Sequence, residues 1–211
     1  MEVACNHYLS LRTDYPKTMA LFSKTAEVQD FNQRVVDSLD TLSISIASID
    51  KELKAVRQRK RVMLRRTVDR VKGLVNGLTG VLEEVQRVGE QISTIGVRFD
   101  RIPEKIVRIA CVPGACELSS GVKITRSQFP LEPASAVTIH KSQGLTLNNV
   151  LLATSSIFTT AQFFVGCSRV RPMDGLHLIV LDSTKATADP KAIKEYDRLR
   201  KLAVINDAPV V

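Results

Sequence analysis

The fold of this chain is decided by the stretch Ala136-Val137-Thr138-Ile139-His140-Lys141-Ser142-Gln143-Gly144-Leu145-Thr146-Leu147. Its first part is rich in apolar and β-branched residues, which predicts a strand over residues 134–139. The polar run that follows ends at Gly144, a residue that permits turn conformations and close backbone approach. A strand that leads into such a loop is typical of the ligand-binding edge of an open α/β sheet.

Strand and helix patterns alternate near both ends of the chain. Apolar segments predict strands at residues 19–22 and 150–153, and helical spacing follows the first of them over residues 25–39. Residues 176–181 are nearly continuously apolar, as buried parallel strands are. This alternation predicts an α/β fold in which both end pieces form one domain. A C-terminal helix after Asp189-Pro190 is expected to turn four residues inward: Ile193, Tyr196, Leu199 and Leu202.

The middle of the chain has a different pattern. Nine Lys and Arg residues lie between Lys54 and Lys72, opposed within that span only by Asp69. Short apolar strands with turn signals surround them, and Asn76-Gly77 predicts a tight hairpin over residues 71–82. The pattern favours a small β-barrel inserted into the α/β domain. The expected division is residues 1–50 and 129–211 for the α/β domain and 51–128 for the basic insertion.

Composition limits the class of protein. The 211 residues carry 30 Lys and Arg against 22 Asp and Glu, a net charge of +8, which favours nucleic acid as a partner before a membrane surface. No apolar run reaches the length of a membrane span, and the first residues lack the pattern of a signal peptide. Four cysteines without a C-x-x-C pair and three scattered histidines predict no metal site.

Four segments resemble the Pif-type DNA helicases, the petite-integration-frequency family of superfamily 1B, related to RecD-type enzymes. Residues 126–131 with 136–147 are similar to the family's motif V, and residues 161–170 to its motif VI. Residues 62–81 resemble the start of the family's inserted barrel, and residues 21–39 its motif IV region. The resemblance implies a RecA-like second motor domain, with a P-loop NTPase-type parallel sheet and a small Src-homology-3-like β-barrel inserted. A Helitron-like transposon is one origin that such a sequence could have.

The resemblance also implies a nucleotide site. Arg169, in motif VI, would be the catalytic arginine finger, which in phosphoryl transfer is worth roughly 10³–10⁵ in rate. The alternative is that Arg169 caps its helix or forms a surface ion pair, and that Gly144 belongs to an ordinary turn. The nucleotide-binding residues implied are Gln143, Gly144, Thr146, Gln162, Ser168 and Arg169.

A second set of residues is expected to contact single-stranded DNA. Hydroxyl, imidazole and ammonium groups in the loop can bind phosphate oxygens or a stacked base, and the basic stretch could line the strand channel. The alternatives are a hydrogen-bonded histidine at a strand end and a solvated basic face. The DNA-binding residues expected are Thr138, His140, Lys141, Ser142, Arg61, Arg65 and Arg66.

Two motifs of a complete helicase motor are absent from the sequence. No glycine precedes a lysine, so there is no P-loop, and no Asp-Glu pair exists to place Mg²⁺. The sequence also departs from the family at Ala161, where glycine is usual, and at Arg59-Lys60 and Arg66. We therefore expect ATP and Mg²⁺ to bind only with a complementing P-loop domain, upstream or separate, and the chain alone to be inactive as an ATP hydrolase.

The interpretation favoured by these observations is the C-terminal half of an ATP-dependent 5′-to-3′ DNA helicase. It would bind single-stranded DNA and supply the arginine finger to a site completed by the P-loop domain. The family suggests DNA repair, recombination and telomere maintenance in the nucleus, with the mitochondrion as the alternative compartment. The competing interpretation is a non-catalytic remnant that binds single-stranded nucleic acid or acts as an interaction module.

Overall fold

The computed structural model describes residues 1–38, 43–48, 51–56, 60–89, 91–117 and 123–205. Its centre is a four-stranded sheet in the order β11-β1-β12-β13, in which every paired strand is parallel. The strands are β1 (Met19–Phe22), β11 (Ala136–Thr138), β12 (Val150–Ala153) and β13 (Leu176–Ile179). Strands from both ends of the chain thus share one sheet, and the expected α/β class is confirmed.

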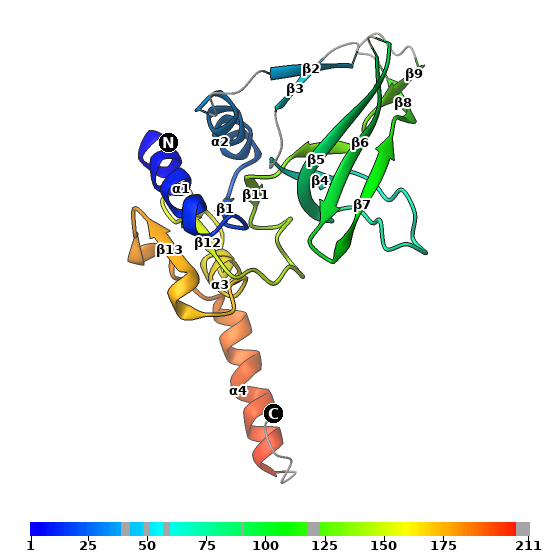
Figure 1. The fold of residues 1–211 in the computed structure, drawn as a ribbon. Coiled ribbons are helices and arrows are strands. Elements are labelled where there is room, and N and C mark those ends of the chain that lie inside the picture. Colours follow the sequence, from blue (N-terminus) through cyan, green and yellow to red (C-terminus); the bar gives the residue numbers. More distant parts are fainter. Residues whose placement is uncertain (39–42, 49–50, 57–59, 90, 118–122, 206–211) are drawn as a thin grey trace.

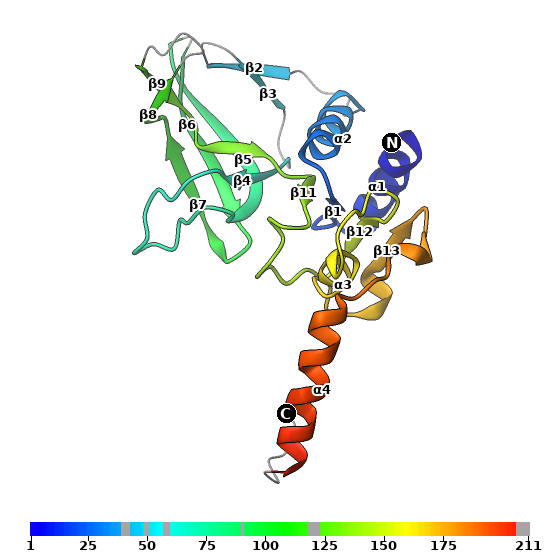
Figure 2. The same cartoon turned by 180° about the vertical axis from the view of Figure 1, so that it is seen from behind.

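Helices cover both faces of the parallel sheet (Figures 1 and 2). Helices α1 (Glu2–Asp14) and α2 (Thr25–Ser38) pack on one face, where the Phe31 ring contacts both Phe22 and Tyr8. The short helix α3 (Gln162–Cys167) packs on the other face, which receives Met19 and Leu21. Alternation along β1 therefore builds two separate apolar layers, as the pleat of a strand requires.

Helix α4 (Pro190–Ile205) begins as the sequence predicts but does not pack as predicted. The Oδ1 of Asp189 accepts a hydrogen bond from the Lys191 amide at 2.7 Å, a cap followed by proline at the first helical position. The helix then projects away from both sheets (Figure 1). The side chains expected to face inward are exposed, because no described element covers them: Ile193, Tyr196, Leu199 and Leu202. Two short 3₁₀ helices, η1 (Met173–Gly175) and η2 (Ser183–Lys185), precede α4.

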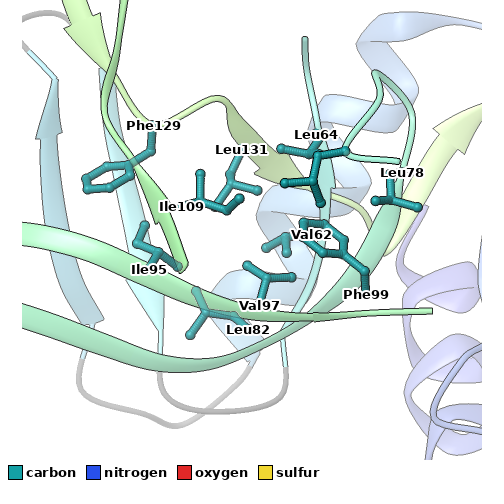
Figure 3. Packing of buried hydrophobic residues seen from close by; sticks show 11 residues of the cluster. Val62, Leu64, Leu78, Leu82, Ile95, Val97, Phe99, Ile109, Phe129 and Leu131 are labelled. Carbon is teal, nitrogen blue, oxygen red and sulfur yellow. The ribbon is translucent and has the colours of Figure 1, made fainter. Parts of the chain in front are cut away.

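An antiparallel sheet is inserted between β1 and β11 in the chain. Its strand order is β10-β4-β5-β6-β7, and an apolar cluster lies against it (Figure 3). The two hairpins, β2–β3 and β8–β9, complete the insertion. The strand order is open over the described residues, so the Src-homology-3-like barrel and the boundaries at residues 51 and 128 remain predictions. The strands are β2 (Ser43–Ser48), β3 (Lys51–Val56), β4 (Arg61–Leu64), β5 (Thr79–Val88), β6 (Gln91–Phe99), β7 (Ile102–Ala110), β8 (Val112–Glu117), β9 (Lys123–Gln128) and β10 (Leu131–Pro133).

Two local predictions were wrong. The Asn76-Gly77 turn exists, with Gly77 at φ 85°, but it precedes β5 instead of joining two strands within residues 71–82. The reason is that β5 pairs with β4, which leaves residues 65–78 as their connection. Residues 176–179 do form a parallel strand, as predicted, but the segment 176–181 is only partly buried, because β13 is the last strand of its sheet and Val180 and Leu181 lie exposed beyond it.

Strand β4 joins the two apolar cores. Val62 and Leu64 point into the cluster of the inserted sheet, whereas Met63 between them packs with residues of the parallel sheet. All three side chains are buried. The insertion is therefore packed against the parallel sheet at β4, next to the loop that the sequence singled out.

Candidate nucleic-acid interface

The ends of β1 and β11 lie side by side at one edge of the parallel sheet. Phe22 is in register with Thr138, so the residues that follow the two strands come together although they are far apart in sequence. Thr25 begins α2 after β1, and Thr138 leads into the loop at residues 139–147. Carboxyl ends of parallel strands are where open α/β sheets bind ligands.

A groove of about 530 Å³ opens at this edge, between α2 and the inserted sheet. Thr25, Gln29 and Gln33 line it from α2, and Thr138 and Lys141 line it from the β11 end. The inserted sheet contributes Arg65 and Glu132. Polar and cationic groups therefore line a groove built by both sheets.

Asn32 fixes one wall of this groove. Its Nδ2 donates to the carbonyl oxygens of Ala136 at 3.0 Å and Pro133 at 3.3 Å, and its Oδ1 accepts from the Ala136 amide at 2.9 Å. The amide side chain thus satisfies backbone groups at the junction of β10 and β11, where the inserted sheet returns to the parallel sheet. A buried amide with three such partners is a structural clamp.

The two groove cations share one carboxylate. Lys141 Nζ lies 2.9 Å from Glu132 Oε1, and Arg65 Nε lies 3.4 Å from Glu132 Oε2. More than half of each cationic side chain is exposed, against 25% of the Glu132 side chain. Both cations can therefore reach a ligand in the groove, provided they leave or share Glu132.

The other residues expected to contact DNA do not line the groove. Arg61 is buried, with its guanidinium 2.8 Å from Asp100 Oδ2, so a structural ion pair accounts for it. Ser142 is also buried and donates its hydroxyl to the Ile139 carbonyl at 2.7 Å. Arg66 is exposed but reaches over β8, donating to the Pro113 carbonyl at 3.1 Å. His140 is exposed in the loop next to Lys141.

Arg169 is folded back onto its own surroundings. Its Nε donates to the Val165 carbonyl at 3.0 Å, one NH₂ group donates to Ser168 Oγ at 2.8 Å, and the other approaches the Leu145 carbonyl at 3.5 Å. The Leu147 amide also donates to the Arg169 carbonyl at 2.8 Å. The segment at residues 161–170 thus lies against the loop at residues 139–147, and in this conformation the guanidinium caps the end of α3.

The remaining residues expected to bind nucleotide divide between two environments. Gln143, Gly144 and Thr146 line a second cavity of about 390 Å³, which they share with the Asn76-Gly77 turn and with Arg101 of the inserted sheet. Gln162 is buried instead, and its Oε1 accepts the Phe158 amide at 3.3 Å. The structure therefore brings Arg169 and Ser168 to the base of the loop but does not bring all six residues to one cavity.

The site has little to hold a metal ion. Within the described ranges, no three His, Cys, Asp or Glu side chains gather as metal ligands. The one acidic residue among those lining the groove, Glu132, is held by two cations. The described side chains thus do not fit Mg²⁺, and we derive no metal-dependent step from this chain.

Among the residues that the structure describes, no helix has the length and apolar character that a membrane crossing needs.

The sequence did not single out Asn32, Thr25 or Glu132 as site residues. Two of them reach the groove through contacts with distant parts of the chain. Thr25 follows β1, which is in register with β11, and Asn32 forms hydrogen bonds to residues about a hundred positions away. The only local signal was the resemblance of residues 21–39 to a family motif. Glu132 carried no signal, because its importance comes from the cations that it meets.

Comparison with known proteins identifies relatives over most of the chain. The "ATP-dependent DNA helicase PIF1" of Danio rerio is 30% identical over 80% of this chain and 26% of its own length. The human protein of the same name is 29% identical over 83% of this chain, again 26% of its length. The Pif1 of Bdellovibrio bacteriovorus is 28% identical over 86% of this chain and 44% of its length. No protein-family model matches the chain.

Solved structures of Pif1 helicases share the fold of this chain. The crystal structure of Pif1 helicase from Candida albicans superposes with a TM-score of 0.68 at 23% identity, over 86% of this chain and 49% of that one. With sequence relatives about 30% identical over most of its length, the chain is homologous to the Pif1 helicases. Bacteroides Pif1 bound to single-stranded DNA gives a TM-score of 0.65 at 25% identity, over 87% of this chain and 45% of that one. The RecA-like fold expected for the parallel sheet is therefore confirmed, and the chain spans about a quarter of its vertebrate Pif1 relatives.

Proposed function

We propose that this chain is the single-stranded-DNA-binding part of an ATP-dependent 5′-to-3′ DNA helicase, and that the groove between α2 and the inserted sheet holds the DNA backbone. The observation that carries the proposal is the placement of Thr138, Lys141 and Arg65 around one groove at the carboxyl edge of the parallel sheet. The crystal structure of the related Bacteroides Pif1 bound to single-stranded DNA supports the choice of ligand. A DNA substrate keeps the nucleus as the expected compartment, with the mitochondrion as the alternative.

The groove chemistry suits a phosphodiester backbone. Lys141 and Arg65 supply positive charge, and Thr25, Thr138 and Gln29 supply hydrogen-bonding groups that need no particular base. The aromatic platforms that stack bases in many single-strand sites do not occur among the described residues lining this groove. We therefore expect binding that depends on phosphates, tolerates any sequence and weakens steeply with salt.

The catalytic part of the proposal concerns Arg169. A P-loop domain, upstream or on a separate chain, would hold ATP and Mg²⁺ against the surface formed by motif VI and the loop at residues 139–147. Arg169 would then leave the Val165 and Ser168 oxygens and turn its guanidinium toward the transferred phosphoryl group. Ser168 and Gln143 would remain as polar neighbours of the nucleotide.

A second candidate function is a non-catalytic module that binds single-stranded nucleic acid. It is favoured by the hydrogen bonds that hold Arg169 on α3 and by the absence of a Gly-Lys pair from the sequence. Both candidates use the same groove. They differ in whether added P-loop chemistry produces ATP hydrolysis, which steady-state ATPase of the joined protein decides.

The DNA-binding proposal is tested by fluorescence anisotropy with a labelled oligothymidylate across a salt series. Replacing Lys141 by Met should weaken binding at low salt and lower the log–log salt slope by about 0.7, the value of one single-strand phosphate contact. Lys105→Met is the matched control, because Lys105 is an exposed cation of the inserted sheet outside the groove. Equal losses for the two variants, or no binding by the wild type at low salt, would refute the assignment of the groove.

A further inference from the structure

Glu132 lies between the two cations that line the groove. It is the only acidic residue among the described residues that line the groove, and Lys141 and Arg65 are the only cations. Its two carboxylate oxygens face different cations, Oε1 toward Lys141 at 2.9 Å and Oε2 toward Arg65 at 3.4 Å. A single bridging anion with two oxygens on two cations has the geometry of a bound phosphate.

We propose that Glu132 is an internal competitor of the DNA backbone, which lowers the affinity of this groove for single-stranded DNA. The inference rests on the proposed function, because it assumes that phosphate enters this groove. It adds a regulatory residue to that function: Glu132 lies outside every stretch that the sequence analysis linked to DNA.

The backbone that carries Glu132 is held in place, whereas the side chains of its two partners are largely exposed. Glu132 lies in β10, in register with Met63 of β4, and the next residue, Pro133, gives its carbonyl to Asn32. The Lys141 and Arg65 side chains are 57% and 59% exposed and extend from a loop and a strand end. An arriving phosphate can therefore draw the two cations away, but Glu132 stays beside it.

The negative charge of the Glu132 carboxylate then repels the phosphate. Two unit charges about 4 Å apart in water interact by roughly 1 kcal/mol, which corresponds to about fivefold in an equilibrium constant. The two ion pairs must also be given up or shared before the cations can bind DNA. Removal of the charge should therefore tighten binding by about fivefold at low salt.

A purely structural role predicts something else. Ion pairs that open to solvent on one side contribute little to stability. A Glu132 with only this structural role would leave DNA affinity unchanged when replaced. Replacing a competitor would change DNA affinity and leave the midpoint of thermal unfolding almost unchanged. The two roles are thus separated by measuring both quantities on one variant.

The test compares Glu132→Gln with Glu83→Gln in the full chain. Both variants remove one carboxylate from an ion pair on the inserted sheet and change the net charge equally, but Glu83 pairs with Arg98 away from the groove. Anisotropy with a labelled oligothymidylate at low salt should show about fivefold tighter binding for Glu132→Gln and a much smaller change for Glu83→Gln. The gain should shrink when Lys141→Met is added to Glu132→Gln, because one of the released cations is then missing.

Each outcome decides the matter. If the wild type binds DNA and Glu132→Gln binds no more tightly than Glu83→Gln, Glu132 is not a competitor and the groove assignment survives. If the gain is the same with and without Lys141, the effect is general electrostatics and the inference fails. If neither the wild type nor Glu132→Gln binds DNA, the proposed function fails and takes this inference with it.

Discussion

At the scale of single residues, Lys60 is a buried cation whose Nζ has no hydrogen-bond partner among the described residues. It is 7% exposed, and burial, with a further contribution from Arg12, lowers the pKa of its ammonium to about 8. Asp37 acts in the opposite direction but does not cancel the effect. The same position departs from the family pattern in the sequence. A buried charge of this kind costs stability whenever it is protonated.

The cost of Lys60 predicts the pH dependence of stability. Because the pKa is about 8 in the folded chain and about 10.4 in an unfolded one, the unfolded state binds more protons between these values. Stability should therefore rise with pH across this window. Lys60→Met should be more stable than the wild type by about 1–3 kcal/mol at pH 7, and by less at pH 9.5. Urea denaturation at both pH values measures this, and a difference that does not shrink at pH 9.5 would contradict it.

Ala161 predicts a second stability change. It precedes α3 at φ 62°, a left-handed conformation that costs an L-residue roughly 1–2 kcal/mol, and the resembling family has glycine there. Ala161→Gly should stabilise the chain by about 0.5–1 kcal/mol after the entropy of glycine is subtracted. Ala26→Gly, at an exposed position of α2 with ordinary helical geometry, is the control and should destabilise. Thermal denaturation of both variants decides whether the strain at Ala161 is real.

At the scale of elements, Asn32 determines how α2 is attached to the junction of the two sheets. Asn32→Ala removes three hydrogen bonds and leaves the buried amide and carbonyl of Ala136 without the partner they have now. The expected loss is about 2–4 kcal/mol, because buried backbone groups are costly to leave unsatisfied. Gln33→Ala, on the same helix but bonded only to exposed Asp37, should stay within about 0.5 kcal/mol. Similar losses for both variants would mean that Asn32 is not a clamp.

Elements were predictable where a local pattern decides them. Residues 19–22, 25–38 and 150–153 form the strand, helix and strand that their periodicity indicates, and residue 39, the last of the predicted helix, lies outside the described residues. The solvent exposure of residues 176–181 and of α4 was not predictable, because it depends on which other element covers them. Periodicity carries no such information. The hairpin at residues 71–82 failed for a related reason: the turn signal was correct, but β4 was the partner of β5.

At the scale of the whole molecule, the site is made by contacts between residues far apart in the chain. The loop at residues 138–141 could be found in the sequence because it is one continuous stretch. Arg61 could not be told from Arg65 in the same basic run, because only the fold reveals that Asp100, 39 residues away, takes Arg61 into a buried pair. Glu132 could not be recognised from the sequence as a site residue for the same reason. The roles assigned to the site residues remain predictions that the groove and loop variants test.

The last prediction concerns ATP hydrolysis by the whole motor. Alone, the chain should show no ATPase activity above background, because no Gly-Lys loop in it cradles phosphates and no Asp-Glu pair places Mg²⁺. An arginine stabilises a transition state only when the phosphoryl group is positioned. Joined to a P-loop domain from a Pif1 relative, the chain should support hydrolysis stimulated by single-stranded DNA.

In that joined protein, Arg169→Ala should lower turnover by at least about 10³-fold while changing the KM for ATP far less, since the guanidinium acts on charge that develops in the transition state. Arg171→Ala is the matched control: Arg171 is an exposed arginine two residues away, and its contact with the loop is through its backbone amide to Leu147. Steady-state ATPase with and without single-stranded DNA measures both. Turnover by the isolated chain that Arg169→Ala abolishes would reveal a nucleotide site within these residues. Equal turnover for Arg169→Ala and Arg171→Ala would leave Arg169 as the cap of α3 and refute the arginine-finger assignment, whereas no hydrolysis by the joined wild type would favour the non-catalytic module.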